Sequence, residues 1–395
     1  MRSLNYFFIL VVIAVTGCKK TYKPSVLSAS NKYLVVEGVI NSGSDSTFIK
    51  LSRTVKLSSK ASSSPELNAI VTVQSDQNTS YPLVEIGNGR YGCAGLNLDN
   101  AHQYRLSIKT TNGKQYLSDY IAVLDSPPID SVSFDTNGTA TAGPGINLYV
   151  NTHDPANKVR YYRWDYQETW IFHSNYLSYF QSNGDSVFFR NLNTDNIHDC
   201  WGNDTSSTII LGTTAKLEKS VIFNDPITSV LSTSEKLTTE YSILVRQYAL
   251  TTEAYDFYTN LKKNTEQLGS VFDALPSEIS GNIHCVTNPA EPVVGYICVG
   301  SVSSRRIFIK SAQWPSWTPT PFYNNCIIEL GPMQPCCYYN YFGVNQVDYY
   351  LNTFIFIPID GIGRPGSPPI GFTASTPQCV DCTLRGTNKR PSFWQ

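Results

Sequence analysis

Residues 103–123, "QYRLSIKTTNGKQYLSDYIAV", place the dipeptide Asn112-Gly113 between two runs rich in Tyr, Leu, Ile and Ser. An Asn-Gly pair between strand-forming runs predicts a β-hairpin. The same pattern continues towards the N-terminus in "KYLVVEGVI" (32–40), "STFIKLSRTVKL" (46–57), "AIVTVQSD" (69–76) and "TSYPLVEIGNGRYGC" (79–93). Roughly seven such runs within about 95 residues predict an immunoglobulin-like β-sandwich over residues 31–126.

A second, larger region of β-sandwich type is predicted over residues 127–395. It begins where Pro127-Pro128 cannot continue a strand ladder, and its first long β-rich run is "GINLYVNTHDPANKVRYYRWDYQETWIFHS" (145–174). One segment of this region changes period and predicts an amphipathic helix near residues 252–268, capped by Thr251 or Thr252 and ended by Gly269. The residues expected on its apolar face are Ala254, Tyr258, Leu261, Thr265 and Leu268.

The N-terminal residues predict an export signal. In "FILVVIAVTGCKK" (8–20) an apolar block, which runs from Tyr6 to Val15, ends in Thr16-Gly17-Cys18 and two lysines. The block is too short to cross a bilayer, which needs about 20 residues. Val15-Thr16-Gly17-Cys18 resembles a bacterial lipobox, which predicts a signal peptide over residues 1–17, lipid attachment at Cys18 and a flexible tether over residues 18–30. An ordinary signal peptide with a chance cysteine and an N-terminal membrane anchor are the alternatives. A protein with several acyl chains is held firmly to a membrane.

Composition agrees with an exported β protein and argues against nucleic-acid binding. The formal net charge is -1, charged residues make up 15% of the chain, and no basic stripe is present. The ten cysteines fit an oxidising compartment. With Cys18 acylated, nine remain, and Cys93 is expected to be free because it lies far from the others. The disulfide candidates are Cys200, Cys285, Cys298, Cys326, Cys336, Cys337, Cys379 and Cys382.

The pairing of these cysteines is open from the sequence. Cys285 and Cys298 flank "NPAEP" and either bridge two adjacent strands or each reach the group formed by Cys326, Cys336 and Cys337. Cys379-x-x-Cys382 would indicate a redox or zinc motif in the cytosol. Behind a lipobox, we expect these two cysteines to staple the C-terminal region through disulfides.

Catalytic motifs are missing from the sequence. It contains no G-x-S-x-G, no H-E-x-x-H and no P-loop, and its five histidines include no i, i+4 pair, so neither a metal nor a cofactor is predicted. The loop holding Asp195, Asp199 and Asp204 lacks EF-hand spacing and is expected to be solvated. Asp165 and Glu168 should point to opposite faces of a strand, which is poor geometry for a glycosidase pair.

Two tryptophans are candidates for ligand contact. Trp164 and Trp170 lie in "RWDYQETW" (163–170), where their rings either stack on a sugar or peptide or belong to the core of the sandwich.

Several phrases in order carry a family resemblance. They are "YLVVEGVI" (33–40), "IKLSRT" (49–54), "YYRWDYQETW" (161–170), "AYDFYTNLKKNTEQLGSVFD" (254–273), "GNIHCVTNPAEPVVGYICVGSVSSRRIFI" (281–309) and "CVDCTLRGTNKRPSFW" (379–394). Together they resemble the domain-of-unknown-function 4249 lipoproteins of diderm bacteria, from about residue 31 to the C-terminus. The resemblance implies an outer-membrane lipoprotein associated with a TonB-dependent transporter, and it supplies no catalytic residues.

The functional expectation is therefore a lipid-anchored, non-enzymatic accessory protein of the outer membrane. It would bind a small glycan or peptide ligand or assemble with a TonB-dependent transporter in nutrient uptake, on a membrane face that the sequence leaves undecided. The alternatives are a secreted hydrolase acting on glycan or peptide and a structural or adhesive envelope lipoprotein.

Overall fold

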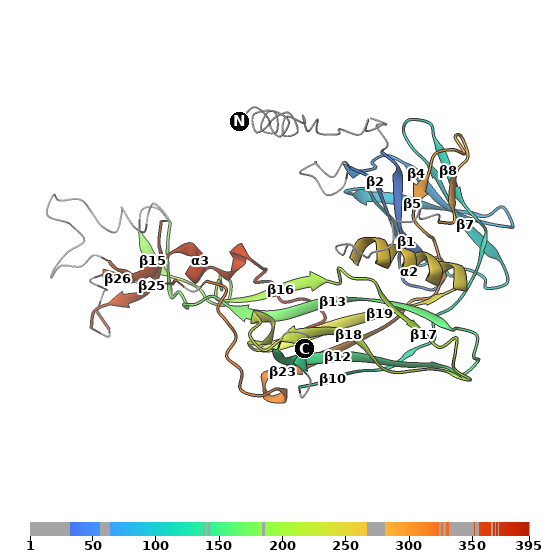
Figure 1. The fold of residues 1–395 in the computed structure, drawn as a ribbon. Helices are drawn as coiled ribbons and strands as arrows, with labels where there is room; N and C mark the ends of the chain where they lie inside the picture. The colour runs from blue at the N-terminus through green and yellow to red at the C-terminus, as the bar shows by residue number, and fades with distance from the viewer. Residues whose placement is uncertain are drawn as a thin grey trace, which may run out of the picture.

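The computed structural model describes residues 32–55, 64–136, 139–140, 143–183, 186–266, 281–323, 325–326, 329–331, 351, 355–364, 366–367, 369 and 371–394. The predicted signal peptide, Cys18, the tether, Cys336 and Cys337 lie outside these residues. The described chain is mainly β, as predicted, with few helices. Its strands form an N-terminal unit, a long-strand unit below it and a smaller lobe at one end (Figure 1).

The predicted hairpin is present in the N-terminal unit. Strands β7 (Gln103–Lys109) and β8 (Gln115–Ser118) pair antiparallel, and Gly113 lies in the turn at a φ of 82°. The sheet follows the order β20-β8-β7-β4-β5-β6-β2-β1-β21, and β3, β9 and β22 pair with it at the side. Its other strands from this part of the chain are β1 (Leu34–Asn41), β2 (Thr47–Arg53), β3 (Ser64–Pro65), β4 (Ile70–Ser75), β5 (Ser80–Gly87), β6 (Arg90–Cys93) and β9 (Ile121–Ala122).

Residues 281–300, called here the returning segment, complete this sheet from far along the chain. Strand β20 (Ile283–Cys285) pairs antiparallel with β8, and β21 (Val293–Val294) and β22 (Val299–Gly300) pair parallel with β1. The sequence prediction had assigned these residues to the second region. The N-terminal unit is therefore built from two separate stretches of chain, because its two end strands each need a partner.

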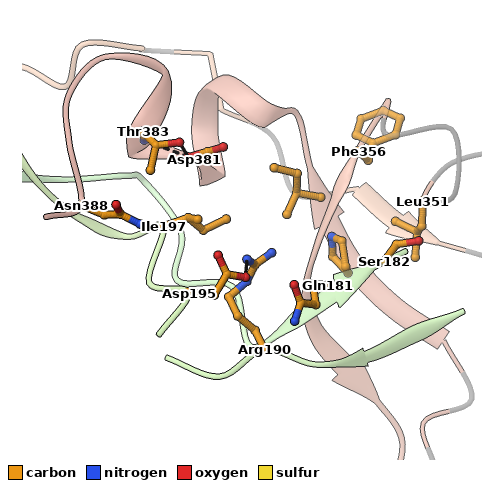
Figure 2. Close-up of a pocket in the computed structure, with 12 residues that line it drawn as sticks. Gln181, Ser182, Arg190, Asp195, Ile197, Leu351, Phe356, Asp381, Thr383 and Asn388 are labelled. Atoms are coloured by element: carbon orange, nitrogen blue, oxygen red, sulfur yellow. Dashed lines mark hydrogen bonds and ion pairs between the residues drawn. The ribbon is translucent and has the colours of Figure 1, made fainter. Parts of the chain in front are cut away.

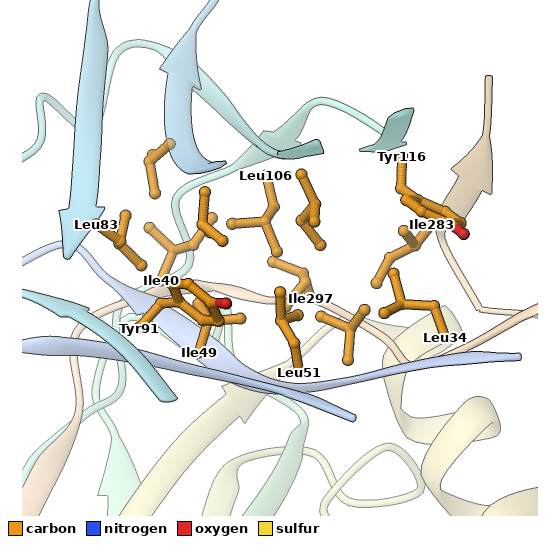
Figure 3. Close-up of a cluster of buried hydrophobic side chains, with 14 of the residues drawn as sticks. Leu34, Ile40, Ile49, Leu51, Leu83, Tyr91, Leu106, Tyr116, Ile283 and Ile297 are labelled. Carbon is orange, nitrogen blue, oxygen red and sulfur yellow. The ribbon is translucent and has the colours of Figure 1, made fainter. Parts of the chain in front are cut away.

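The core of the N-terminal unit includes side chains from both stretches. Ile283 and Ile297 of the returning segment lie among Leu34, Leu51 and Tyr116 (Figure 3). Each of these five side chains is at most 4% exposed. Burying a side chain of this size stabilises the fold by about 1.5–3 kcal/mol, so the returning segment belongs energetically to this unit.

Asn282 fixes the returning segment by imitating a peptide group. Its side-chain NH₂ donates to the Ile297 carbonyl and its Oδ1 accepts from the Ile297 N–H, both at 2.9 Å. The neighbouring Gly281 is needed because a Cβ there would lie 1.6 Å from the Gly295 carbonyl oxygen. The Gly281-Asn282 pair thus closes the loop between β20 and β22.

The long-strand unit consists of two sheets that face each other. One contains β10 (Ile129–Asp135), β11 (Thr139–Ala140), β12 (Gly143–Asp154) and β18 (Ser220–Leu231), and the other contains β13 (Tyr161–His173), β16 (Asp199–Thr205), β17 (Ile210–Thr213), β19 (Glu240–Leu250) and β23 (Ser303–Lys310). Alternate residues of the long strands pack between the sheets, with Leu148 and Val150 from one side and Tyr162, Ile243 and Val245 from the other. Each is fully buried.

Gln247 links the two sheets of the long-strand unit to each other and to Pro127 at the predicted boundary. Its Oε1 accepts from the indole N–H of Trp164 at 2.9 Å, and its NH₂ donates to the Pro127 carbonyl at 2.8 Å and to Thr152 Oγ1 at 3.1 Å. The side chain is fully buried, so leaving these groups unpaired would cost about 1–3 kcal/mol each.

The predicted helix is present as α2 (Thr252–Glu266) and lies between the two units (Figure 1). Thr251 caps it by accepting from the Ala254 N–H at 3.2 Å. Ala254 and Tyr258 are buried as predicted, whereas Thr265 is exposed and Leu268 lies outside the described residues. The buried face contacts residues of β1, of the returning segment and of β13 and β17. Among the described residues, no helix has both the length and the apolar character required to cross a bilayer.

The third part, called here the cysteine lobe, lies at one end of the long strands. It contains β14 (Phe180–Ser182), β15 (Val187–Phe189), β24 (Glu329–Gly331), β25 (Ile357–Ile362), β26 (Gly371–Ser375) and the short helix α3 (Pro377–Val380). Disulfides join Cys200 to Cys382 and Cys326 to Cys379. Further single turns of 3₁₀ helix lie at Glu235–Leu237, Ser311–Gln313 and Cys382–Leu384.

Replacing Asn282 with alanine should lower the free energy of unfolding by about 2–4 kcal/mol, because it leaves the Ile297 N–H and carbonyl unpaired in the core. Urea unfolding at neutral pH measures the change. Asn288→Ala is the matched control, since Asn288 is exposed on the same segment and should change stability by less than about 0.5 kcal/mol. Equal effects of the two substitutions would contradict the role of Asn282.

Glu291 should make the free energy of unfolding depend on pH in the acidic range. Its burial raises the pKa, but hydrogen bonds from Lys114 and Tyr116 and the charge of Arg53 outweigh this, so its pKa in the folded protein is lowered. A lowered carboxyl pKa stabilises the fold above the ordinary value of about 4.3 and loses that contribution as the pH falls further. Glu291→Gln should cost about 1.5–3 kcal/mol at pH about 7 and much less at pH about 3, as measured by urea unfolding. A cost that does not shrink on acidification would contradict this, and the exposed Glu218→Gln serves as control.

Candidate functional site

A cleft of about 750 Å³ separates the N-terminal unit from the long-strand unit. One wall comes from β1, β2 and Arg90 of β6, and the other from β13, β19 and the start of β23. Clefts between structural units are common positions for ligand sites. Seven charged side chains line it, of which four are cations and three are carboxylates: Lys50, Arg90, Arg163, Arg246, Glu37, Asp45 and Asp165.

Arg163 is the most enclosed cation of the cleft. Its guanidinium carbon lies 4.3 Å from the ring centre of Tyr248 and 4.8 Å from that of Tyr258, so the group is held between two aromatic faces. Its Nε is shielded from solvent and has no hydrogen-bond partner among the described residues. A guanidinium stays protonated in proteins, and stacking on aromatic rings lowers the cost of burying it. Arg163 thus places an enclosed positive charge in the wall of the cleft, which favours an anionic group there.

Asp165 neutralises part of the same wall. It accepts from Arg246 Nε at 2.6 Å and from the Tyr248 hydroxyl at 2.8 Å. Burial raises the pKa of Tyr248, and the charge of Asp165 adds to the increase, so the phenol stays a donor to the carboxylate. Asp165 is thus occupied by two donors from β19, whereas Arg163, two residues earlier on β13, has no carboxylate hydrogen-bonded to it among the described residues.

The opposite wall is more exposed. Lys50 and Glu37 form a cross-strand pair at 2.9 Å, with each side chain about half exposed, and Arg90 lies over the ring of Phe48. Pairs of this kind contribute at most about 1 kcal/mol to stability. They are therefore free to rearrange around a bound group.

The predicted ligand-contact residues do not line the cleft. Trp164 is 1% exposed and packs in the core of the long-strand unit, which contradicts the expectation that it contacts a ligand. Trp170 packs against the same core, with the ammonium of Lys236 5.0 Å from its ring centre. The physical reason is strand alternation: even-numbered residues of β13 face the core, and odd-numbered ones, Arg163 and Asp165, face the cleft.

The two acids considered for hydrolysis lie on opposite faces of β13, as expected. Asp165 is in the cleft, whereas Glu168 is buried and accepts from the Tyr241 hydroxyl at 2.6 Å and from Lys236. Burial strongly raises the pKa of Tyr241, and Glu168 adds to that increase. These acids therefore do not face one sugar or peptide bond.

Four of the candidate cysteines form the two described disulfides, and three of the described cysteines are free. Cys93 has a free thiol, in agreement with the sequence prediction. Cys285 and Cys298 are also free and buried, so the expected bridge between them, or from either to Cys326, is absent. The reason is that Cys285 lies in the core of the N-terminal unit, whereas Cys298 packs against α2.

A second pocket, of about 520 Å³, lies in the cysteine lobe (Figure 2). Arg190 and Asp195 form an ion pair at its floor, and Asp381 and Thr383 line another side. Asp381 accepts from the Thr383 N–H at 2.8 Å and from its hydroxyl at 2.6 Å. Because Arg190 and Asp195 pair with each other and Asp381 is hydrogen-bonded to Thr383, the charged groups of this pocket already have partners.

The three aspartates of the Asn-rich loop lie apart. Asp195 pairs with Arg190, Asp199 with His173, and Asp204 with Lys236. Within the described part of the chain, one group combines metal-ligand chemistry with close spacing: His173, His198 and Asp199, whose ligand atoms all lie within 4.8 Å of one another. Sequence reasoning missed this group, as it missed Arg163, although the alternation of "RWD" places Arg163 and Asp165 on one face.

Comparison with known proteins gives a family and no activity. A family model described as "Domain of unknown function (DUF4249)" matches residues 19–306. No curated protein matches the chain. Among solved structures, a two fibronectin type III domain segment from chicken tenascin matches at 12% identity, covering 55% of this chain and 91% of that chain. Its TM-score is 0.16, and a similarity this weak does not establish a shared fold.

Cys298 should resist alkylation in the folded protein, because burial raises the pKa of its thiol to about 11. Mass spectrometry after alkylation without reductant should find Cys298 modified only once urea has unfolded the chain. Non-reduced peptide mapping should recover the pairs Cys200–Cys382 and Cys326–Cys379. A disulfide-linked peptide containing Cys285 or Cys298 would contradict the structure.

Proposed function

The chain belongs to the DUF4249 family, and from this premise we propose that it is a lipid-anchored accessory protein of the outer membrane. In this proposal it binds a ligand in the cleft between its two large units, or assembles there with a TonB-dependent transporter, and so serves nutrient uptake. It carries out no chemical reaction itself.

Membrane attachment is supported by the sequence Val15-Thr16-Gly17-Cys18 and the short apolar run before it. The lipid would be attached to Cys18, and the polar residues 19–30 would let the protein move relative to the membrane. The face of the membrane on which it lies is left open by this proposal.

The cleft is the observation that carries the binding role. It combines the enclosed positive charge of Arg163, which has no carboxylate hydrogen-bonded to it among the described residues, with exposed charge pairs on the other wall. Such a site suits a polar ligand with an anionic group, for example a peptide carboxylate or an acidic sugar, or an acidic segment of a transporter. Sheets hold both walls of the cleft in place. In this proposal residues 31–126 form an immunoglobulin-like scaffold that supports one of these walls.

Two other functions compete with this one. A hydrolase acting on glycan or peptide would need convergent acids, and Asp165 and Glu168 are each committed to other partners on opposite faces of β13. A purely structural or adhesive lipoprotein would need no charged cleft, so loss of the cleft charges would leave its role intact.

Replacing Cys18 with alanine should move the protein from the membrane to the soluble fraction, because the thioether-linked lipid can no longer form. Fractionation of the bacterium followed by immunoblotting measures this. Mass spectrometry of the wild-type N-terminal peptide should show acylated Cys18. An unmodified N-terminal peptide in the wild type would overturn the lipoprotein assignment.

Replacing Arg163 with methionine should leave membrane attachment intact and reduce binding to the partner at least about 10-fold, since one charge-assisted hydrogen bond contributes about 1.5–3 kcal/mol. The measurement is recovery of a β-barrel transporter with the tagged protein from solubilised outer membrane. Arg364→Met, at an exposed arginine outside the cleft, is the matched control. Recovery of no transporter with the wild type, or equal recovery with both variants, would count against the proposed role of the cleft.

A further inference from the structure

His173, His198 and Asp199 meet where two strands of the long-strand unit end beside the cysteine lobe. His173 is the last residue of β13 and Asp199 the first of β16, and these two residues are register partners in the antiparallel ladder. The Ser174 N–H donates to the His198 carbonyl at 3.0 Å, which extends the pairing by one step. The two imidazole rings stack with centres 5.1 Å apart.

The potential ligand atoms of the three side chains lie close together. Asp199 Oδ1 lies 2.7 Å from His173 Nδ1 and 3.9 Å from His198 Nε2. Each side chain is also held at its far end by a neutral polar group. His173 Nε2 contacts Thr239 Oγ1 at 2.9 Å, His198 Nδ1 contacts Ser174 Oγ at 2.9 Å, and Asp199 Oδ2 accepts from Asn196 at 2.8 Å.

Hydrogen-bond accounting fixes the tautomer of neutral His198. The single hydroxyl proton of Ser174 goes to the Tyr176 carbonyl at 2.9 Å, because a carbonyl can only accept. Ser174 Oγ must then accept from His198 Nδ1–H, which leaves the lone pair of His198 on Nε2. That lone pair faces the carboxylate of Asp199. Two electron-rich atoms facing each other are stabilised when a cation lies between them.

The geometry points to a binding site for a late first-row divalent metal ion, held by His173 Nδ1, His198 Nε2 and Asp199. All ligand atoms lie within 4.8 Å of one another, and small side-chain rotations bring them to the spacing of roughly 3.4 Å that metal–ligand distances of about 2.1 Å require. In the bound form, His173 carries its proton on Nε2 and donates it to Thr239. Two imidazoles and one carboxylate suit Zn²⁺, Ni²⁺, Cu²⁺ or Fe²⁺ better than Ca²⁺ or Mg²⁺.

The site also has the supporting contacts that metal ligands usually have. Second-sphere hydrogen bonds orient ligating histidines and carboxylates, and Thr239, Ser174 and Asn196 provide one to each ligand. Asn196 further accepts from the backbone N–H groups of His198 and Asp199, which fixes the loop. The three ligands are between 24% and 43% exposed, so a water molecule or an incoming group can take the fourth position.

Binding would join β13 to the loop that leads into the Cys200–Cys382 disulfide. The ion would therefore brace the junction of the long-strand unit with the cysteine lobe, independently of the cleft and of the proposed transporter. The metal site can therefore be tested without a cleft ligand and without the transporter.

The experiment uses the full mature chain purified in detergent, stripped with a chelator and titrated with Zn²⁺ alone by calorimetry. One Zn²⁺ per chain is expected. His198→Gln and the nearly isosteric Asp199→Asn should each weaken binding at least about 100-fold, and Ser174→Ala about 10-fold, since loss of an outer-sphere partner costs roughly 10–100-fold in affinity. Co²⁺ should give the absorption bands of a four-coordinate site without a thiolate charge-transfer band.

His153→Gln is the matched control, because His153 also pairs with a single aspartate, Asp130, at 2.7 Å but has no second histidine beside it. It should bind Zn²⁺ as the wild type does. Circular dichroism checks that each variant is folded. The proposal is overturned if the wild type binds no Zn²⁺, if His198→Gln and Asp199→Asn bind it as tightly as the control, or if Co²⁺ shows a thiolate band.

Discussion

The parallel pairing of β21 and β22 with β1 is the constraint on which the rest of the structure depends. It brings Tyr296 and Cys298 beside α2, so that the helix is packed between the N-terminal unit and the β13–β17 face. β1 and β13 contribute to opposite walls of the cleft, so this packing also positions the two walls. The bidentate contact of Asn282 with Ile297 maintains this pairing at the level of single hydrogen bonds.

The two faces of strand β13 have different roles. Its even-numbered side chains, Tyr162 and Trp164 among them, build the core of the long-strand unit, and Gln247 ties that core to Pro127. Its odd-numbered side chains present Arg163 and Asp165 to the cleft, and its last residue, His173, reaches the candidate metal site. A strand of 13 residues is long enough to touch all three parts of the molecule.

Features that depend on local chemistry were predictable from the sequence. The Asn112-Gly113 hairpin, the Thr251-capped helix and the opposite faces of Asp165 and Glu168 all follow from neighbours within a few positions. Features that depend on distant pairing were not. The residues next to Ile283 do not indicate that it pairs with β8. Cys200 and its disulfide partner Cys382 are 182 residues apart in the sequence. The role of Trp164 stayed open between ligand contact and core because composition does not tell which face of a strand is covered. The two histidines are 25 residues apart, with no helical spacing that would indicate a shared site.

The returning segment also affects the order in which the protein can fold during synthesis. The ribosome synthesises β1 and β8 long before residues 281–300. Until then one edge of each strand has unpaired backbone N–H and C=O groups, with which a neighbouring chain can pair. The N-terminal unit cannot close until synthesis has passed residue 300 of the 395 residues, so its folding waits for the returning segment and does not follow the order of synthesis.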